Sequence, residues 1–323
     1  MINKRKKVLI LGGAGFIGKN LALYLEKQGY DVFCFDHNTC EYGQKITFIK
    51  GDFFHLEELN SAIKGMDCVV HAISTVNPGN SNDKYMLGYQ NDFLQTVKLC
   101  DVLLKEHIKM VFISSGGTVY GDHPEGQPLV EDSYTEPINH YGNVKLCIEN
   151  AMRSFDHQME GHFLIARVSN PYGRGQNFHK GVGFIDAVLK NTIHNLPVEI
   201  WGDGENIRDY VYIDDVCGMI ESIINYEGNI NTFNVCSGVG TSQNQIIKIV
   251  QNLGYTPQVI YKEKRKVDVR SIILDNHRIM KIWKHNPIDI EEGIKRYSEY
   301  LQGLQTNAME EEIKEHERCG CNK

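Results

Sequence analysis

A glycine-rich turn directly after a short apolar segment constrains this chain more than any other feature. Val8-Leu9-Ile10-Leu11 runs into Gly12-Gly13-Ala14-Gly15-Phe16-Ile17-Gly18. Residues 7–11 predict a buried strand, and residues 16–28 predict a helix that ends at Gly29. Glycines in such a turn let backbone N–H groups approach phosphate oxygens, and the helix macrodipole attracts the negative charge. The pattern predicts a parallel sheet that binds the pyrophosphate of a dinucleotide.

Alternating apolar and amphipathic segments extend this pattern through the first half of the chain, as is typical of β–α–β units. Predicted strands lie at residues 31–35, 48–49, 67–73, 110–114 and 163–168, and predicted helices at 89–106 and 140–157. We therefore predict an α/β fold with a doubly wound parallel sheet. It comprises a cofactor-binding domain at 1–170, a smaller α/β lobe at 171–305 that returns some chain to the first domain, and a polar tail at 306–323, either a frayed helix or disordered.

Composition narrows the possible partners and compartment. A formal net charge of −7 argues against a broad nucleic-acid-binding surface. No apolar run approaches the ~20 residues of a membrane span. The nine cysteines show no framework spacing, which fits reduced thiols in a cytoplasmic protein. Cys319 and Cys321 have no further ligands nearby, so we expect no metal site there.

Acidic residues after the second and third predicted strands are candidates for the adenosine half of the dinucleotide. Asp36 lies 18 residues after Gly18, where a carboxylate accepts both ribose hydroxyls and repels a 2′-phosphate. This favours NAD over NADP, because the neighbouring His37 is not a compelling phosphate clamp. Asp52 is a weaker candidate for the adenine amino group, since most Gly-Asp pairs are turns.

A tyrosine and a lysine one helical turn apart provide the candidate proton chemistry. Tyr141 and Lys145 lie at i and i+4 of the helix predicted at 140–157. A nearby ammonium group and a cationic nicotinamide ring favour the phenolate form, so we expect a lowered pKa for Tyr141. Ser114-Ser115-Gly116-Gly117-Thr118 ends a preceding buried strand, which places hydroxyl groups at the same edge of the sheet.

These residues, taken in order, resemble the extended short-chain dehydrogenases/reductases, in particular the nucleotide-sugar epimerase and dehydratase group and most closely UDP-glucose 4-epimerase-like enzymes. The resemblance covers residues 7–301 and includes Gly51-Asp52, His71, Ser114 to Gly121, Tyr141 to Lys145, Asn170 to Gly173, Trp201 to Gly204 and Arg208-Asp209-Tyr210. It implies a Rossmann-type sheet, a nucleotide-diphosphate sugar as substrate, and a homodimer built on the two long helices.

The resemblance also implies site residues. It places NAD against Gly12, Gly15, Phe16, Ile17, Gly18, Asp36, His37, Asp52, Phe53, Ala72, Asn91, Ser114, Tyr141 and Lys145. Asn91 would support the nicotinamide end. It places the substrate against Thr118, Asn170, Arg208 and Arg265, with guanidinium groups suited to the diphosphate.

One departure from the family affects the assignment of roles. Many relatives carry a catalytic serine where this chain has Gly116, so Thr118 or, next, Ser115 must supply that hydroxyl. The 4,6-dehydratases carry Thr-Asp-Glu where this chain has Gly116-Gly117-Thr118, which disfavours dehydration.

The combined interpretation is an NAD-dependent 4-epimerase that oxidises a sugar at C4 and returns the hydride to the other face, with Tyr141, Lys145 and Thr118 as catalytic residues. The alternatives are another nucleotide-sugar enzyme, such as a uronate epimerase, a decarboxylase or a 4,6-dehydratase, and a non-catalytic NAD-binding sensor. Ile272 stands where some relatives carry a bulky tyrosine, which leaves room for an N-acetylhexosamine.

Overall fold

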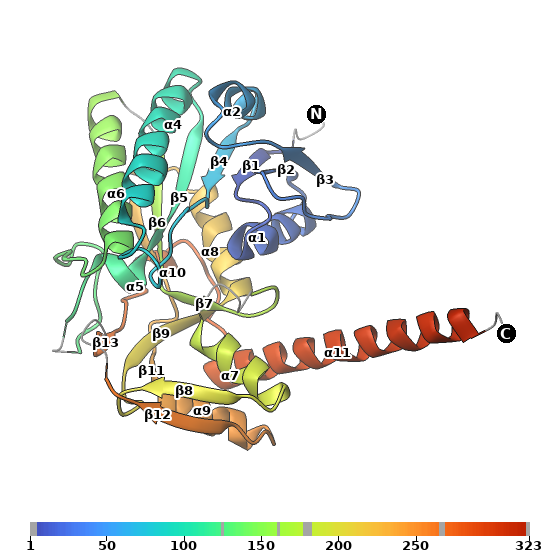
Figure 1. Ribbon diagram of the computed structural model, residues 1–323. Helices are drawn as coiled ribbons and strands as arrows, with labels where there is room; N and C mark the ends of the chain where they lie inside the picture. Colours follow the sequence, from blue (N-terminus) through green and yellow to red (C-terminus); the bar gives the residue numbers. More distant parts are fainter. Residues whose placement is uncertain (1–4, 124–125, 160–161, 177–182, 265–268, 321–323) are drawn as a thin grey trace.

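Seven parallel strands form the central sheet of the computed structural model, which describes residues 5–123, 126–159, 162–176, 183–264 and 269–320 (Figure 1). Their order across the sheet is β10-β6-β5-β4-β1-β2-β3. The bounds are β1 Lys7–Leu11, β2 Asp31–Asp36, β3 Ile46–Lys50, β4 Cys68–His71, β5 Lys109–Ser115, β6 Phe163–Val168 and β10 Thr232–Val235. The predicted α/β class with a doubly wound parallel sheet is confirmed.

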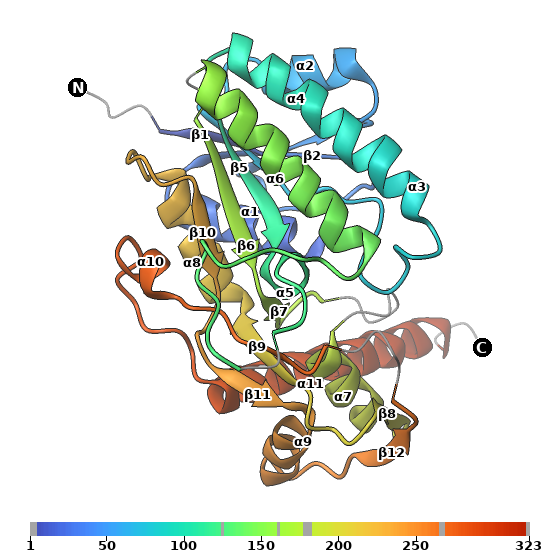
Figure 2. The same ribbon diagram turned by 90° about the vertical axis from the view of Figure 1, so that its left-hand side faces the viewer.

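Both faces of this sheet are covered by helices, which explains why its strands read as continuous apolar runs. In β1, Val8 and Ile10 pack on one face, while Leu9 and Leu11 pack on the other. The first face is covered by α1 (Phe16–Lys27) and α8 (Ile213–Ile224). The second is covered by α2 (Leu56–Ile63), α4 (Leu94–Lys105) and α6 (His140–Met159), with α4 and α6 side by side in Figure 2.

The strand order reverses between β1 and β4, and this reversal creates the crevice of a Rossmann-type fold. β1 pairs with β2 on one side and with β4 on the other, and every neighbouring pair is parallel. The chain therefore leaves the carboxyl ends of β1 and β4 in opposite directions, and ligands of open α/β sheets bind at that point. The glycine turn follows β1, so the topology places it at the crevice.

The long helix predicted at residues 89–106 is divided into three parts. A short α3 (Tyr85–Leu87) leads into a π-helical segment, η1 (Gly88–Phe93), which continues into α4. A π-helical turn holds one residue more than an α-helical turn, and such turns are frequent at functional sites. The side chains that face inward from η1 therefore cannot be read from a spacing of three and four residues.

A smaller lobe carries two further groups of strands below the central sheet. Three strands surround β9 (Ile207–Tyr212): β7 (Asn170–Tyr172), β11 (Gly240–Ser242) and β13 (Ser271–Ile272). A separate pair joins β8 (Pro197–Trp201) to β12 (Gln258–Lys262). The helices of the lobe are α7 (Phe184–Ile193), α9 (Gln243–Asn252) and α11 (Ile290–Gly320), while α10 (His277–Met280) packs against β10 of the central sheet. α8 and β10 lie between these elements in sequence but belong to the larger domain.

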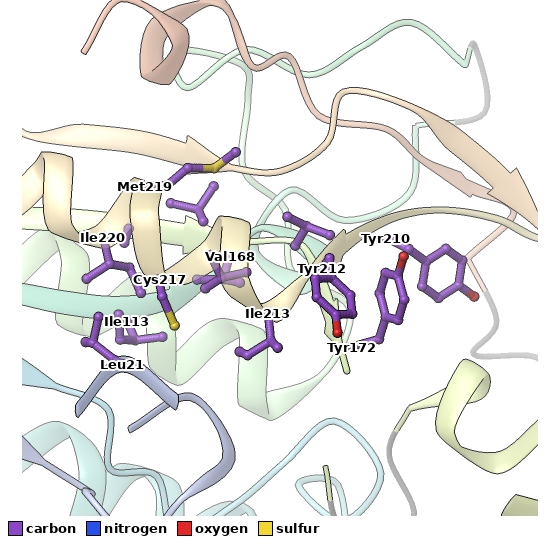
Figure 3. Packing of buried hydrophobic residues seen from close by; sticks show 14 of the residues in the cluster. Leu21, Ile113, Val168, Tyr172, Tyr210, Tyr212, Ile213, Cys217, Met219 and Ile220 are labelled. Carbon is purple, nitrogen blue, oxygen red and sulfur yellow. The ribbon is translucent and has the colours of Figure 1, made fainter. Parts of the chain in front are cut away.

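One apolar cluster joins the lobe to the sheet, so the two parts share a core. Tyr172 of β7 contacts the ring of Tyr212 edge-on, with 5.5 Å between centroids, and that of Tyr210 at 6.5 Å. In Figure 3 these rings adjoin Ile213 and Cys217 of α8, which pack toward the sheet. The lobe is therefore held against the cofactor-binding domain by burial of apolar surface.

The chain from residue 306, for which we expected a frayed helix or disorder, continues α11 as far as Gly320. Figure 1 shows α11 extending away from the body of the molecule. Cys319 lies in this last helical stretch, while Cys321 is outside the described residues.

A buried ion pair fixes the middle of α6 to the sheet. Arg167 of β6 donates from Nη2 to Glu149 Oε2 at 2.7 Å and from Nε to Oε1 at 3.1 Å. Ser114 of β5 donates its hydroxyl to the same carboxylate at 2.6 Å. The side chains of Glu149 and Arg167 are 0% and 2% exposed, so neither charge is screened by water.

We expect Arg167→Met to destabilise the protein by about 3–5 kcal/mol, because the substitution leaves the Glu149 carboxylate buried without its main counter-charge. Urea unfolding followed by circular dichroism measures the change. The control is Arg296→Met, whose ion pair with Glu292 is about half exposed on α11, and which should change stability by less than about 1 kcal/mol. Equal losses in the two variants would contradict a special role for the buried pair.

Candidate active site

The glycine turn packs so closely that side chains are excluded at key positions. Gly12 has φ +90°, a backbone conformation that favours glycine. A Cβ at Gly18 would stand 2.1 Å from the carbonyl oxygen of Gly12, so the first turn of α1 lies directly on the loop. Gly15 caps α1 without a side-chain hydrogen bond, and Phe16 and Ile17 begin the helix. The first N–H groups of α1 are therefore suited to a pyrophosphate.

Asp36 lies beside this turn at the end of β2. Its carboxylate accepts hydrogen bonds from Ala14 N at 3.1 Å and Asn38 N at 2.9 Å, and the residue is 8% exposed. The His37 ring lies 3.3 Å from the same carboxylate, with its side chain 75% exposed. A buried acid next to the phosphate turn fits a ribose with free hydroxyls and disfavours a 2′-phosphate.

The other cofactor candidates differ in what their side chains can do. Gly51 N donates a hydrogen bond to Asp36 O, which places the adjacent Asp52 beside the end of β2. The Oδ1 atom of Asp52 accepts a hydrogen bond from Phe54 N. The Phe53 ring is buried beside His71, at 5.1 Å between centroids, so only its backbone can face a ligand. Ala72 N bonds Leu11 O at 2.9 Å, which places Ala72 next to the glycine turn.

The side chain of Ser114 is directed away from the crevice. Its hydroxyl is donated to Glu149 in the core, and the residue is 3% exposed. In this fold the Ser114 side chain therefore does not reach the cofactor site that the resemblance implied for it. The neighbouring Ser115 is half-buried and faces the opposite way, into the cavity described below.

Lys145 is buried next to Tyr141, as the i and i+4 spacing predicted. Its Nζ donates to Ile113 O at 3.1 Å and lies 5.5 Å from the centroid of the Tyr141 ring. Burial lowers the pKa of Lys145 to about 8, and the carboxylates of Asp92 and Glu149 oppose that shift. The protonation state of Lys145 therefore depends on these two neighbouring carboxylates.

The expected lowering of the Tyr141 pKa is not found in the chain by itself. Burial raises the pKa of Tyr141 above its ordinary value, and the carboxylate of Asp92 raises it further. A hydrogen bond with the Ser115 side chain opposes this shift. The expected lowering of this pKa included the charge of the nicotinamide ring, which is not part of the chain; in the chain alone, desolvation of the phenolate decides the direction of the shift. A phenolate here needs additional positive charge.

Asp92, rather than Asn91, is the polar side chain of η1 that is buried at this site. Asp92 is 3% exposed and accepts hydrogen bonds from Ser74 Oγ at 2.7 Å and Thr75 Oγ1 at 2.7 Å. Asn91 is half-buried in the same π-helical segment. Asp92 belongs to no motif in the sequence, and only the packing of the π-helical segment shows that its side chain is buried.

A cavity of about 640 Å³ joins the catalytic helix to the smaller lobe. From the larger domain it is lined by Ser115, Thr118 and Tyr141, and from the lobe by Asn170 and Arg208. Residues from distant parts of the sequence, from Phe16 to Ile272, thus meet in one space, as the site prediction required. Arg265 is the one predicted substrate residue that lies outside the described residues.

Asn170 and Arg208 are positioned by β7 and β9. Asn170 Nδ2 donates to Asp209 O at 3.0 Å, and Arg208 Nη1 donates to Ile207 O at 2.7 Å. Asp209, the neighbour of Arg208 in β9, is fully buried. It accepts from Ser237 N at 2.9 Å, which ties β9 to the loop after β10.

Several amide oxygens that sequence analysis did not identify also face this cavity. Gln176, Asn206 and Gln243 line it, and among the described residues the side-chain oxygen of each is buried without a hydrogen-bond partner. Buried acceptors of this kind are costly unless a ligand or water supplies a donor. No sequence motif distinguished them, because isolated amides are common in loops and helix ends.

The surroundings of Gly116 explain why this chain lacks the serine that many relatives carry at this position. A Cβ at Gly116 would lie 2.4 Å from Leu274 Cδ1 and 3.0 Å from Arg167 O. Leu274 is fully buried in a small cluster with Val119 and Tyr120. The packing of this chain therefore excludes any side chain at Gly116, including serine.

In the described ranges, no group of three or more His, Cys, Asp or Glu side chains is arranged to hold a metal ion. No helix in the same part of the chain is both long enough and apolar enough to cross a membrane.

Comparison with known proteins identifies the family. Residues 8–236 match the model of the NAD dependent epimerase/dehydratase family. A putative UDP-glucose 4-epimerase of Methanocaldococcus jannaschii is 30% identical over 91% of this chain and 98% of its own length. A dTDP-4-dehydro-6-deoxyglucose reductase of Escherichia coli is 28% identical over 91% and 96%. The solved UDP-glucose 4-epimerase of Thermotoga maritima, crystallised with UDP-glucose, superposes with a TM-score of 0.86 at 27% identity and covers 93% of this chain and 99% of that one. The chain therefore belongs to the NAD dependent epimerase/dehydratase family, and NAD is its cofactor.

Proposed function

We propose that this protein is a nucleotide-sugar 4-epimerase acting on a UDP-hexose or a UDP-N-acetylhexosamine. The observation that carries the proposal is the single cavity in which Tyr141 and its neighbouring hydroxyls face Arg208 and Asn170. A proton-transfer group at one end and phosphate-binding groups at the other match a sugar that is tethered through its diphosphate. The 4-epimerases among the relatives support the same assignment.

The residues of the crevice fit NAD and would hold its pyrophosphate and adenosine. The turn from Gly12 to Gly18 and the first turn of α1 receive the pyrophosphate, and Asp36 receives the adenosine ribose. Asn91 and the backbone of Phe53 and Ser114 remain proposed contacts. NAD, when bound, supplies a reversible hydride acceptor for C4 of the sugar.

Tyr141 acts as the base that removes the proton from the C4 hydroxyl and later returns it. Lys145 stabilises the phenolate form through its ammonium group and also reaches the nicotinamide ribose. A cationic nicotinamide ring, when bound, would add positive charge that favours the buried phenolate. Because Tyr141 gives back the proton it removed, the reaction is redox-neutral overall.

A hydroxyl beside Tyr141 stabilises the oxygen at C4 as its charge develops. Thr118 is the residue favoured by the sequence, and its Oγ1 lies 3.5 Å from Ser115 O at the start of α5 (Gly116–Val119). Ser115 is the alternative, and its hydrogen bond with Tyr141 favours it for this role. We propose that Ser115 takes part directly and that Thr118 contacts the sugar.

The lobe binds the nucleotide diphosphate while the sugar remains free to turn. Arg208 and Asn170 receive the diphosphate, with Arg265 as a further proposed contact. The unpartnered amide oxygens of Asn206 and Gln243 accept hydrogen bonds from N–H or O–H groups of the substrate. Ile272 lines the cavity as a medium-sized apolar side chain, which is compatible with an N-acetyl group.

A 4-ketosugar reductase is a second candidate, because the Escherichia coli relative carries that name. A reductase consumes a reduced cofactor at every turnover, whereas the epimerase reaction does not. Decarboxylation requires a cationic partner for a uronic carboxylate, and dehydration requires an additional acid and base where Gly116 and Gly117 stand.

A homodimer that pairs α4 and α6 of two copies remains a proposal. Leu94 at the start of α4 is 51% exposed, and Leu87 just before it is 41% exposed. By contrast, Val144, Ile148 and Met152 of α6 pack on the protein's own sheet.

We expect the purified protein with NAD to convert UDP-glucose or UDP-N-acetylglucosamine to its 4-epimer, measured by NMR of the sugar. Tyr141→Phe should reduce kcat by about 10²–10⁴-fold with NAD still bound, because the base is lost and the ring is kept. Tyr134→Phe, at an exposed tyrosine that is 73% accessible, is the control and should retain activity.

The same panel includes UDP-glucuronate and dTDP-4-dehydro-6-deoxyglucose with NADH. Stoichiometric consumption of NADH with the latter would assign reduction in place of epimerisation. If no UDP-sugar is epimerised and Tyr141→Phe changes no measured activity, the 4-epimerase assignment is wrong.

Ser115→Ala should lower kcat by about 10²–10³-fold, as expected for loss of a donor to the C4 oxygen. Thr118→Val, which keeps the shape of the side chain, should raise KM more than it lowers kcat. Steady-state kinetics with the best UDP-sugar separates the two effects. A larger fall in kcat for Thr118→Val would assign the catalytic hydroxyl to Thr118 instead.

Gly116→Ser should not restore the family's usual serine, because Leu274 occupies its place. We expect a loss of about 1–3 kcal/mol in unfolding free energy from overpacking. In a Leu274→Ala background the added loss should be smaller, and a double-mutant cycle measures this coupling. The same loss in both backgrounds would mean that the Arg167 carbonyl, rather than Leu274, excludes the side chain.

A further inference from the structure

Asp92 is a buried carboxylate whose nearest partners are all neutral. Its two oxygens accept hydrogen bonds from Thr75 N at 2.9 and 3.0 Å, from Thr75 Oγ1 at 2.7 Å and from Ser74 Oγ at 2.7 Å. In the part of the chain that the structure describes, no ion pair within 4.0 Å includes it. These donors satisfy its lone pairs and fix its position, but they do not neutralise its charge.

Packing of η1 against the start of α6 places this charge near the catalytic pair. A Cβ at Gly88 would lie 3.0 Å from Val144 Cγ2, between Tyr141 and Lys145 along α6. Tyr89 OH lies 3.1 Å from His140 Nδ1 and accepts a hydrogen bond from Asn143 Nδ2 at 2.6 Å. These contacts hold the first two residues of the π-helical segment against α6, within one turn of Asp92.

The surrounding charged groups leave Asp92 as the main anion acting on both catalytic residues. His71 of β4 is fully buried, and burial lowers its pKa to about 3, so it is neutral at physiological pH. Glu149 of α6 also acts on Lys145, but it is paired with Arg167. On Lys145 and on Tyr141, Asp92 contributes the largest effect from a neighbouring charge.

We propose that Asp92 is a positioning residue for the proposed reaction: its buried carboxylate keeps Lys145 in the ammonium form and keeps the Tyr141 hydroxyl protonated until ligands bind. The sign follows from simple electrostatics. An anion favours the charged lysine and disfavours the charged phenolate. Because burial already brings the pKa of Lys145 down to about 8, loss of the anion makes much of the lysine neutral near pH 7.

The test is Asp92→Asn, which removes the charge and keeps one oxygen to accept from Thr75, while its amide nitrogen faces the Ser74 hydroxyl, which can accept a hydrogen bond. In the full chain with NAD bound, the titration midpoint of Lys145 should fall by about one pH unit. It is measured by ¹³C NMR of the lysine ε-carbons, with Lys145→Met to assign the resonance. This readout does not require turnover, so it separates failure of the present proposal from failure of the proposed epimerase activity.

If the enzyme epimerises a UDP-sugar, the pH profile of kcat/KM provides a second readout. Both the acid limb, set by Tyr141, and the alkaline limb, set by Lys145, should move to lower pH by about one unit in Asp92→Asn. A loss of thermal stability or of kcat with the Lys145 titration unmoved would overturn the proposal and leave Asp92 a structural residue.

Two controls distinguish charge from packing. Thr75→Val removes a hydrogen bond to Asp92 but keeps the carboxylate, so it should leave the Lys145 midpoint in place. Asp101→Asn removes an exposed carboxylate of α4 that pairs with Lys105, and it should have no effect on either limb. If Asp92→Asn does not fold, Asp92→Ser provides a second neutral variant, and it must show the same fall in the Lys145 midpoint.

Discussion

The buried ion pair between Glu149 and Arg167 fixes the helix on which the proposed chemistry depends. Glu149 lies four residues after Lys145 and eight after Tyr141, on the same helix α6. Arg167 comes from β6, and Ser114 binds the same carboxylate from β5. The position of Tyr141 over the crevice is therefore set from two strands of the sheet. A helix attached only by apolar contacts would have more freedom to rotate, since hydrophobic burial is not directional.

The electrostatics of the site follow from burial more than from the Tyr-Lys pair itself. Desolvation raises the pKa of Tyr141 and lowers that of Lys145, and both changes disfavour the charged forms. Neighbouring side chains oppose each of these two pKa shifts. Asp92 supports the ammonium form of Lys145, and Ser115 supports the phenolate form of Tyr141. Because burial still favours the neutral phenol, Tyr141 would need further positive charge to act as the proposed base.

The cavity exists because two parts of the chain share one apolar core. Tyr172, Tyr210 and Tyr212 of the lobe pack with residues of α8, and α8 itself covers the main sheet. This continuity holds Arg208 and Asn170 at a fixed position relative to Tyr141. A site that spans two lobes can in this way keep the diphosphate anchored while the sugar end has room to move.

Sequence alone determined the features that depend on local spacing. The strands at Lys7–Leu11 and Phe163–Val168, the glycine turn and the placement of Tyr141 with Lys145 follow from short-range patterns, because strand and helix periodicities are local. Tertiary structure decided the rest. The packing of the π-helical turn buried Asp92, contact with Leu274 explained why Gly116 has no side chain, and burial set the direction of the Tyr141 pKa shift in the chain alone. Each of these depends on which distant segments come together, and neither residue type nor spacing records that.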